Sequence, residues 1–476
     1  GILAGSASSF GSGAIVDNAT LRIDQAGDAI FANPISGSGT LMKTGAGTLS
    51  LSGANSYAGG TTVTQGTLSI AADQNLGAAS GALNLDGGTL RTTSAFATAR
   101  NVDLGAGGGT LQTAADLSAS GIVSGAGALT KTGAGTLTLT GANPYAGGTT
   151  INAGTLAGSA ASFGSGAIAN NAALRIDQPE DATLANTVSG SGTVTKTGAG
   201  TLTLSGENSY SGGTDLKEGR LAVGNNRALG SGELAMHEGT ILRFAADGLS
   251  LANPIAFTEA VDPFIDTGAF TATLTGAITG PGDLSKIGSG TLILAGANTY
   301  SGATTVAEGT LRAGAANTFS PASAHSVNPA ATLDLAGFSQ SVAALTNAGT
   351  VSLIGSAPGT TLTVTGPYVG NNGLLRLGTA LGDSASVSDR LVLSGPSAVA
   401  SGRTTVQVVN LGGLGALTTG NGIELVSAQG GATTTAQSTQ DAFALQGGHV
   451  DAGAYEYRLQ PGDAAGAGEN WYLRST

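Results

Sequence analysis

The sequence predicts an all-β fold, a right-handed parallel β-helix (solenoid) with a C-terminal β capping region. Short segments alternate apolar and polar residues with the period of 2 that buries one face of a strand. Gly- and Asn-rich stretches suited to tight turns separate these segments. The pattern recurs several times along the chain, and no stretch keeps the 3.6-residue period of an amphipathic helix.

The strands can be followed residue by residue in the first copy of the pattern. In Thr48–Ser52, Leu49 and Leu51 alternate with hydroxyl side chains. The segments Thr61–Thr64 and Thr67–Ile70 repeat this alternation, and glycine-containing turns lie between them. We therefore expect three short strands in this stretch, each with one buried face.

Internal repeats set the architecture. A longer duplication overlies the short pattern, because Leu3–Asp24 returns as Leu156–Asp177, a shift of 153 residues. The short pattern occurs four times, in Gly37–Ile70, Gly125–Gly158, Gly190–Val223 and Gly280–Ala313. The four copies are unevenly spaced, which disfavours a propeller of constant blades. A solenoid tolerates uneven spacing because each turn contacts only its neighbours. With about 20–25 residues per turn, roughly 20 turns are expected.

Composition and charge exclude several classes of partner. The net charge is -12, and only 10% of the residues are charged. Binding a phosphate backbone needs clustered Lys and Arg, so nucleic acid is not expected as a partner. No stretch reaches the roughly 20 apolar residues of a membrane-spanning helix, so direct membrane insertion is not expected. With no Cys, the fold must rely on its core, and we expect a monomer.

The motif G-x-G-T-L-x-K-T-G-x-G-T-L-x-L-x-G-x-N-x-Y-x-G-G-T resembles the autotransporter-associated β-strand repeat. With its flanking turns it covers most of Gly1–Pro367. Such repeats occur in passengers of type V secretion systems. The resemblance implies a Gram-negative surface or secreted location after export through the periplasm and outer membrane. It also implies, as a partner, the protein's own outer-membrane β-barrel translocator, outside this chain.

A different resemblance covers the last hundred residues. Leu381–Gly395, Asn421–Val426, His449–Leu459 and Asn470–Ser475 resemble the pertactin-like autochaperone region, which in that family caps the β-helix and promotes its folding. We therefore divide the chain into a stalk, residues 1–372, and a cap, residues 373–476. A local gathering of aromatic residues supports a capping core. The residues assigned to cap structure and folding are Asp451, Tyr455, Tyr457, Arg458, Trp471 and Tyr472.

The start of the chain suggests a longer protein. Gly1-Ile2-Leu3 aligns with Gly154-Thr155-Leu156, which closes a repeat in the second copy. Gly1 is therefore expected to lie in mid-unit, with further sequence, including any N-terminal effector, upstream.

No catalytic, cofactor-binding or metal site is predicted. His237, His325 and His449 lie in different regions and none belongs to H-E-x-x-H, so zinc is not expected. The dipeptide Gly-Lys and the G-x-S-x-G elbow do not occur, which argues against a P-loop and an α/β-hydrolase nucleophile. We therefore expect a protein that is not an enzyme.

One acidic segment is a candidate interaction loop. Glu259, Asp262 and Asp266 lie close together in a place that an earlier copy fills with neutral residues. Clustered carboxylates on neighbouring turns could act on glycans. A solvated turn is the simpler interpretation, and we favour it.

Three residue types recur in every copy of the motif. The lysines Lys43, Lys131, Lys196 and Lys286 are interpreted as exposed side chains that prevent edge-to-edge pairing. The asparagines Asn55, Asn143, Asn208 and Asn298 suit turns with positive φ. The tyrosines Tyr57, Tyr145, Tyr210 and Tyr300 are expected to cover those turns while their hydroxyls face water. We interpret all of them as scaffold.

The leading functional hypothesis is a surface-displayed stalk that acts in adhesion and virulence through a host or bacterial ligand, protein or glycan. The alternative is the stalk of an autotransporter enzyme, such as one with a subtilisin-like protease outside this chain. A third hypothesis is glycan turnover at Glu259–Asp266. In each case, a C-terminal cap that orders first would give the next turn a template.

Overall fold

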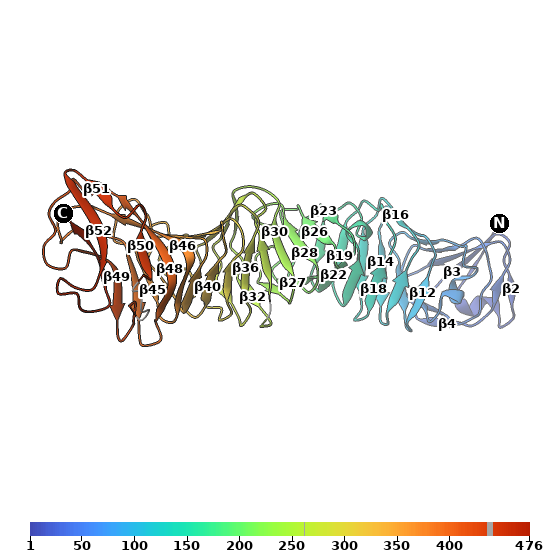
Figure 1. The fold of residues 1–476 in the computed structure, drawn as a ribbon. Coiled ribbons are helices and arrows are strands. Elements are labelled where there is room, and N and C mark those ends of the chain that lie inside the picture. The colour runs from blue at the N-terminus through green and yellow to red at the C-terminus, as the bar shows by residue number, and fades with distance from the viewer. Residues whose placement is uncertain (261, 436–440) are drawn as a thin grey trace. The chain divides into compact units, whose positions relative to one another are not determined.

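The computed structural model describes residues 1–260, 262–435 and 441–476. The chain forms two compact units, Gly1–Glu233 and Leu234–Thr476. Both are built of stacked parallel strands, which confirms the predicted all-β solenoid (Figure 1). Single turns of 3₁₀ helix interrupt the first unit at η1 (Ala7–Phe10), η2 (Asp73–Leu76) and η3 (Ala160–Ser162). Within the described ranges, no helix is long and apolar enough to cross a membrane.

The first unit contains three long parallel sheets. One consists of β1 (Ile2–Gly5), β3 (Thr20–Asp24), β6 (Thr40–Thr44), β8 (Thr61–Val63), β10 (Leu83–Leu85), β13 (Val102–Leu104) and β16 (Val123–Gly125). The second consists of β4 (Ala29–Phe31), β7 (Thr48–Leu51), β9 (Thr67–Ile70), β11 (Thr89–Thr92), β14 (Gly109–Thr113), β17 (Leu129–Thr132), β19 (Thr149–Ile151), β21 (Ile168–Asn170) and β24 (Val188–Ser189). The third consists of β12 (Phe96–Thr98), β15 (Leu117–Ala119), β18 (Thr136–Leu139), β20 (Thr155–Gly158), β22 (Ala173–Asp177), β25 (Thr193–Thr197) and β27 (Thr214–Leu216). Shorter groups are β2 (Ile15–Val16) with β5 (Ile35–Ser36), and β23 (Ala182–Leu184) with β26 (Thr201–Leu204) and β28 (Arg220–Val223).

Register places like residues above one another. Leu21 lies opposite Leu41, and Leu41 lies opposite Thr61, so each of these turns takes 20 residues. Leu21 and Leu41 are each at most 1% exposed. Stacked leucines of successive turns thus form a continuous core, and their burial is the main favourable contribution to folding.

The second unit repeats this construction. One parallel series consists of β30 (Ile241–Phe244), β33 (Phe264–Asp266), β36 (Leu284–Ile287), β38 (Thr304–Val306), β40 (Ala324–Val327) and β43 (Ala344–Asn347). A second consists of β31 (Leu249–Leu251), β34 (Thr271–Leu274), β37 (Thr291–Leu294), β39 (Thr310–Ala313), β41 (Thr332–Asp334) and β44 (Thr350–Ser352). Both series meet β46 (Tyr368–Thr379), which continues to β48 (Ala400–Asn410) and β50 (Phe443–Leu445). A short group contains β29 (Leu234–Met236), β32 (Ile255–Phe257) and β35 (Ile278–Thr279).

The recurrent asparagines act as scaffold in a way the sequence did not predict. None of the four belongs to the non-glycine residues with positive φ, so the predicted turn conformation is wrong for them. Instead, the Asn55 amide accepts a hydrogen bond from Ile35 N at 2.9 Å and donates one to Asn75 O at 2.7 Å. Asn298 bonds in the same way to Ile278 N and Thr318 O. Each amide therefore joins the turn before it to the turn after it.

The recurrent tyrosines are buried to the tip, so the expectation of a water-facing hydroxyl is wrong. Tyr57 and its counterparts are 0% exposed. The Tyr57 hydroxyl lies 2.6 Å from Oγ1 of Thr61, four residues further along the same motif. That threonine satisfies the hydroxyl inside the core, so no water is needed. Burial raises the pKa of Tyr57 to about 12.

The recurrent lysines are also buried, which overturns the interpretation that they are exposed side chains blocking edge pairing. Lys131 is 0% exposed. Its ammonium donates to the carbonyls of Thr132, Gly133 and Ala153 at 3.0, 2.8 and 2.8 Å. Lys43, Lys196 and Lys286 each make the same three kinds of contact. Three acceptors match the three protons of an ammonium. Burial lowers the pKa of Lys131 to about 8.

The glycine turn beside each lysine explains this geometry. Gly45 adopts a φ of +78°, where a Cβ would come within 2.6 Å of the Gln25 carbonyl oxygen on the neighbouring turn. Only glycine fits this close approach without strain. The turn directs the Gly45 carbonyl toward the Lys43 ammonium, 2.6 Å away.

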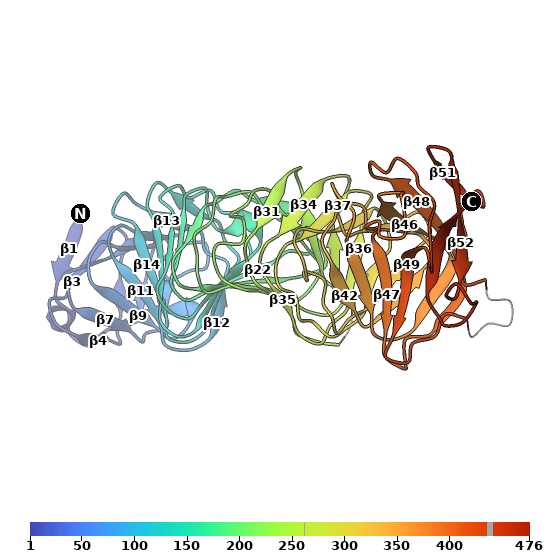
Figure 2. The same ribbon diagram turned by 90° about the vertical axis from the view of Figure 1, so that its left-hand side faces the viewer.

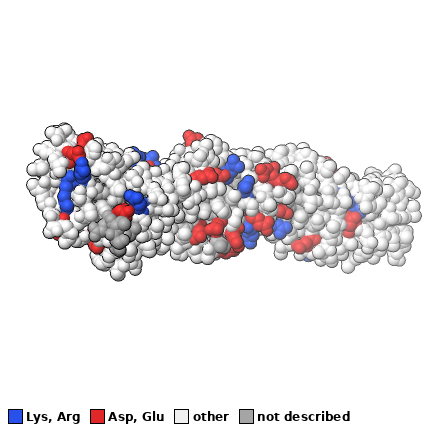
Figure 3. Space-filling view, in the orientation of Figure 1, with Lys and Arg blue, Asp and Glu red and all other residues white. Residues whose placement is uncertain are grey.

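The remaining surface carries few charges, and on the face drawn in Figure 3 they form small scattered groups.

Candidate functional site

The C-terminal sheet changes direction at its last strands. Its parallel part consists of β42 (Gln340–Val342), β45 (Thr361–Val364), β47 (Arg390–Ser394) and β49 (Ile423–Gln429). Its antiparallel part consists of β53 (Trp471–Ser475), β52 (Tyr455–Pro461) and β51 (Val450–Ala452), as Figure 2 shows in red. The chain returns and pairs β53 with β49, so a further parallel turn cannot add at that edge.

Trp471 joins this sheet to its neighbour. The indole is 3% exposed, and its Nε1 donates to Thr434 Oγ1 at 3.0 Å. Its ring packs edge-on against Phe443 with centroids 5.5 Å apart, and Phe443 in turn contacts Tyr368 at 5.6 Å. This aromatic series connects β46, β50 and β53. Aromatic pairs of this kind add about 0.5–1.5 kcal/mol each beyond area burial.

Tyr457 fixes a neighbouring loop. It is 0% exposed. Its hydroxyl accepts from Ala416 N at 2.9 Å and lies 2.8 Å from the Gly382 carbonyl oxygen. Ser475 Oγ accepts from Thr418 N of the same loop at 2.7 Å. Tyr457 of β52 and Ser475 of β53, which lie opposite one another in the sheet, therefore both hold residues 416–418 in place.

The other assigned cap residues lie on the same antiparallel strands but at the surface. Tyr455 and Tyr472 are half-buried, whereas Asp451 and Arg458 are exposed. The Arg458 guanidinium pairs with Glu456 at 2.5 Å. All six assigned residues thus belong to one three-stranded element, with Tyr457 and Trp471 forming its core. Their role in folding remains a prediction.

Sequence reasoning missed several residues of this region. Asp389 is 0% exposed, and its carboxylate accepts from Gly359 N, Thr360 N and Gly378 N at 2.7–2.9 Å. Burial raises the pKa of Asp389 above its ordinary value, and these hydrogen bonds oppose that shift only in part. Thr434 and Phe443, the partners of Trp471, were also missed. The segment containing Asp389 was recognised as cap-like, but only tertiary contacts identify these three side chains.

The predicted domain boundary at 372–373 falls inside β46. The register between β46 and β48 shifts between Asn371 and Leu374, and Asn372 adopts a φ of 58°. The division into residues 1–372 and 373–476 stays a prediction.

Among the residues that the structure describes, the carboxylates of the acidic segment contact different partners. Glu259 Oε1 lies 3.2 Å from His237 Nδ1. Asp266 accepts from Gly268 N at 2.7 Å and lies 3.8 Å from the Arg243 guanidinium. Asp262 is exposed. Glu259 and Asp266 therefore have separate basic partners, and the interaction role of the three acids stays a prediction.

Three side chains at the cap surface could offer ligands to a cation. One ligand atom each of His449, Asp451 and Glu456 lies within 4.8 Å of the others. Two of the three residues are exposed, and Glu456 already pairs with Arg458. Exposed acidic groups often gather without a metal, so this cluster does not by itself define a site.

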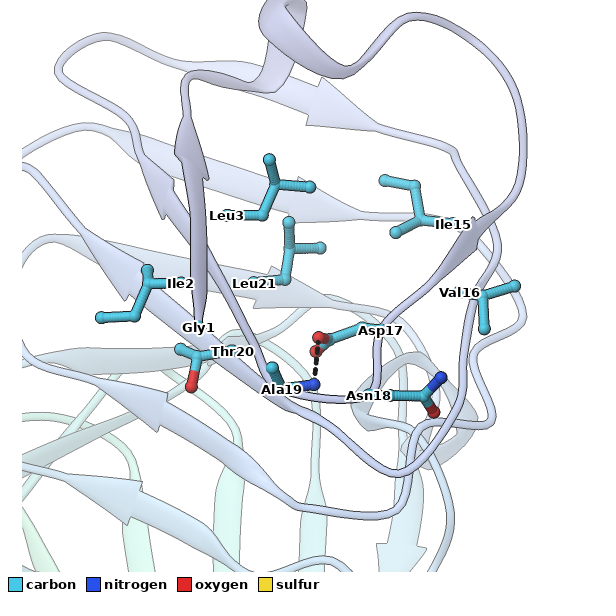
Figure 4. A pocket seen from close by; sticks show the side chains of 10 residues that line it. All are labelled: Gly1, Ile2, Leu3, Ile15, Val16, Asp17, Asn18, Ala19, Thr20 and Leu21. Carbon is cyan, nitrogen blue, oxygen red and sulfur yellow. Dashed lines mark hydrogen bonds between the residues drawn. The ribbon is translucent and has the colours of Figure 1, made fainter.

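A hollow of about 380 Å³ lies beside the first strands of the chain (Figure 4). Leu3, Ile15 and Leu21 line it, and the Asp17 carboxylate accepts from Ala19 N at 3.0 Å. In the second copy of the duplicated unit, β18 and β19 pair with the strands equivalent to β1 and β2. The equivalent strands of the second copy, β20 and β21, are thus each paired with a strand of the turn before them.

Family models match two kinds of module in the chain. The model of the type 1 autochaperone domain matches residues 340–459. The model of the passenger-associated-transport-repeat matches residues 41–70, 129–157, 194–223 and 284–313. Each repeat match contains one recurrent lysine, asparagine and tyrosine described above.

Several curated proteins are similar to parts of the chain. The adhesin BmaC autotransporter of Brucella suis biovar 1 is 34% identical over 299 residues, which cover 62% of this chain and 8% of that protein. The uncharacterized protein YuaQ of Escherichia coli K12 is 39% identical over 199 residues, 42% of this chain and 14% of that protein. The autotransporter adhesin AIDA-I of Escherichia coli is 37% identical over 119 residues, 25% of this chain and 8% of that protein. The chain thus spans only 8–14% of the length of these relatives.

Proposed function

Because this chain belongs to the passengers of autotransporters, with their transport repeats and a type 1 autochaperone domain, we propose that it is a displayed stalk acting in adhesion. In this proposal the solenoid contacts a host or bacterial surface ligand, and the C-terminal cap, residues 373–476, promotes folding after export. Similarity to two proteins named as adhesins supports the adhesive role.

The closure of the C-terminal sheet by β53, β52 and β51 is the observation that carries the folding role. These strands pair antiparallel with one another and with β49, so they can form from local contacts before the parallel turns exist. A preformed edge then offers hydrogen bonds to the next parallel strand. Outside the outer membrane the chain must drive its own folding. Burial of its apolar side chains is the main favourable contribution.

The proposal includes two further expectations. An outer-membrane β-barrel translocator of the same polypeptide exports the chain to the Gram-negative surface, where it stays attached or is released. The solenoid contributes no catalysis, since its recurrent polar side chains, such as Lys131 and Tyr57, already make hydrogen bonds within the scaffold.

Surface display tests both parts of the proposal. The chain would be joined to an outer-membrane translocator in a non-adherent Gram-negative strain. Protease-resistant display and attachment to cultured epithelial cells would then be measured. We expect display of a protease-resistant passenger and increased attachment. Trp471→Ala should reduce protease-resistant display severalfold, because a buried Trp→Ala change costs about 3–5 kcal/mol.

Tyr472→Ala is the matched control, since this half-buried neighbour contributes less to the cap core. Full display without any gain in attachment would contradict the adhesive role. Undiminished protease-resistant display of Trp471→Ala would contradict the role of the cap.

A further inference from the structure

Two adjoining hollows lie on the outer face of the third sheet of the first unit. The larger, about 440 Å³, is lined by Phe96, Asp116, Ser118 and Arg175 among others. The smaller, about 220 Å³, lies along β18, β20 and β22. Thr138 and Arg175 line both, so the two form one shallow groove. Figure 1 labels β12, β18 and β22 of this sheet. The larger hollow falls within the ~300–1,000 Å³ of small-molecule sites.

Strand register explains why the groove exists. The outward positions of five successive strands are aligned as Ala97, Ser118, Thr138, Ala157 and Arg175. The first four side chains are small, and only the last is long. Ala157 faces outward by register but is 1% exposed. Since Arg175 lines both hollows, its side chain extends over Ala157 toward Thr138.

The Arg175 guanidinium has no hydrogen bond or ion pair with any residue that the structure describes. It therefore keeps five donors available in a planar fork, the arrangement that binds a carboxylate in a bidentate way. The acidic side chains nearby, Asp116 and Asp177, are both exposed. They disfavour a ligand with many negative charges.

The rest of the groove suits hydroxyl groups. Ser118, Thr136, Thr138 and Thr140 supply hydroxyls that both donate and accept. Asp116 accepts from Thr136 N through one oxygen, and a carboxylate has further acceptor capacity. The half-buried Phe96 ring adds an apolar surface at one end. A ligand complementary to this set carries one carboxylate, several hydroxyls and a small apolar face.

We propose that the Arg175 groove binds a carboxylated saccharide, with the sugar carboxylate on the Arg175 guanidinium and the sugar hydroxyls on the Ser, Thr and Asp side chains. This inference rests on the proposed adhesive function and assigns it a ligand class. A hexuronic acid and a sialic acid share the required chemistry. Weak binding at one groove is compatible with firm attachment, because many displayed copies act together.

Saturation-transfer NMR on the purified full chain tests the proposal with four probes: glucuronate, N-acetylneuraminate, galactose and acetate. We expect at least one acidic sugar to bind at least tenfold more tightly than galactose and acetate. Whichever of glucuronate and N-acetylneuraminate binds more tightly identifies the ligand as a hexuronic acid or a sialic acid. Arg175→Ala should weaken binding at least tenfold, and Thr138→Tyr, which fills the groove from an outward position, should weaken it similarly.

The duplicated unit supplies a matched control. Arg22 occupies the position of Arg175 in the first copy and is also exposed. It lies between Ala4 and Met42 instead of Ala157 and Thr195. Arg22→Ala should leave binding unchanged. Failure of both acidic sugars to bind, or equal losses for Arg22→Ala and Arg175→Ala, would overturn the proposal.

The display assay separates this inference from the proposed function. Attachment of cells carrying the parent chain, without binding of either acidic sugar, would refute the groove and leave the adhesive role standing. Sugar binding that depends on Arg175, without any attachment, would support the groove and refute the adhesive role.

Discussion

Replacing Arg100 by methionine is expected to lower the free energy of unfolding of the Gly1–Glu233 unit by about 3–5 kcal/mol. Arg100 is 3% exposed. Its guanidinium binds both carboxylate oxygens of Asp73 at 2.8 and 3.1 Å. It also donates to the carbonyls of Ala78, Gly81 and Gly77 at 2.5–3.0 Å. Methionine keeps the apolar stem but removes this donor from the buried carbonyls of Gly77 and Gly81, each at a cost of about 1–3 kcal/mol.

Guanidinium unfolding followed by far-UV circular dichroism measures this change. Arg91→Met is the control, because Arg91 is exposed on the outer face of β11 and should change stability by no more than about 0.5 kcal/mol. Equal midpoints for Arg100→Met and the parent chain would show that the Arg100 network does not stabilise the solenoid.

Acidification from pH 6.5 to pH 4 is expected to remove about 3 kcal/mol of stability through His325 alone. This side chain is 2% exposed, with its ring 5.7 Å from Phe319. Nδ1 lies 3.1 Å from the Ser323 carbonyl oxygen, and Nε2 has no partner among the described residues. Burial lowers the pKa of His325 to about 4. A charged imidazole would be desolvated there without a counter-ion.

The direction of this change in stability with pH follows from how many protons the folded and unfolded chains bind. Unfolded histidine titrates near pH 6.5, and folded His325 near pH 4. Between these values the unfolded chain holds a proton that the folded chain lacks, so stability falls as the pH falls. Denaturant unfolding at several pH values would measure the slope. His325→Phe should reduce this pH-dependent loss of stability by about 3 kcal/mol over the range. An unchanged slope in His325→Phe would refute the assignment.

Local pattern predicted the strands well. Leu49 and Leu51 are at most 3% exposed, as their alternation with Thr and Ser indicates. The repeat spacing predicted stacked turns, because register in a solenoid follows from sequence periodicity. These features depend only on neighbours along the chain and on like residues one turn away.

Polar residues of the motif could not be placed from sequence. The sequence alone predicts that Lys131 is exposed, because Lys is almost never fully buried. It is buried because a Gly-containing turn and the next turn together present three carbonyls to its ammonium. Tyr57 follows the same logic through Thr61. In both cases the deciding partner is backbone or a turn residue whose direction the sequence does not reveal.

The candidate sites show the same limit. Trp471 was identified by composition, yet its partner Thr434 lies 37 residues away in sequence. The Arg175 groove depends on the register of five strands, and no local motif marks it. Such sites depend on which residues of successive turns become neighbours, and the structure is needed to identify those neighbours.

The most direct test of the cap as the seed of the fold is equilibrium unfolding in guanidinium, with far-UV circular dichroism and Trp471 fluorescence recorded together. Trp471 is the only tryptophan, so its emission reports the cap alone, while circular dichroism reports all strands. We predict that the Trp471 transition occurs at a higher guanidinium concentration than the main loss of strand signal. Coincident transitions, or loss of the Trp471 signal first, would contradict a stable cap that templates the solenoid.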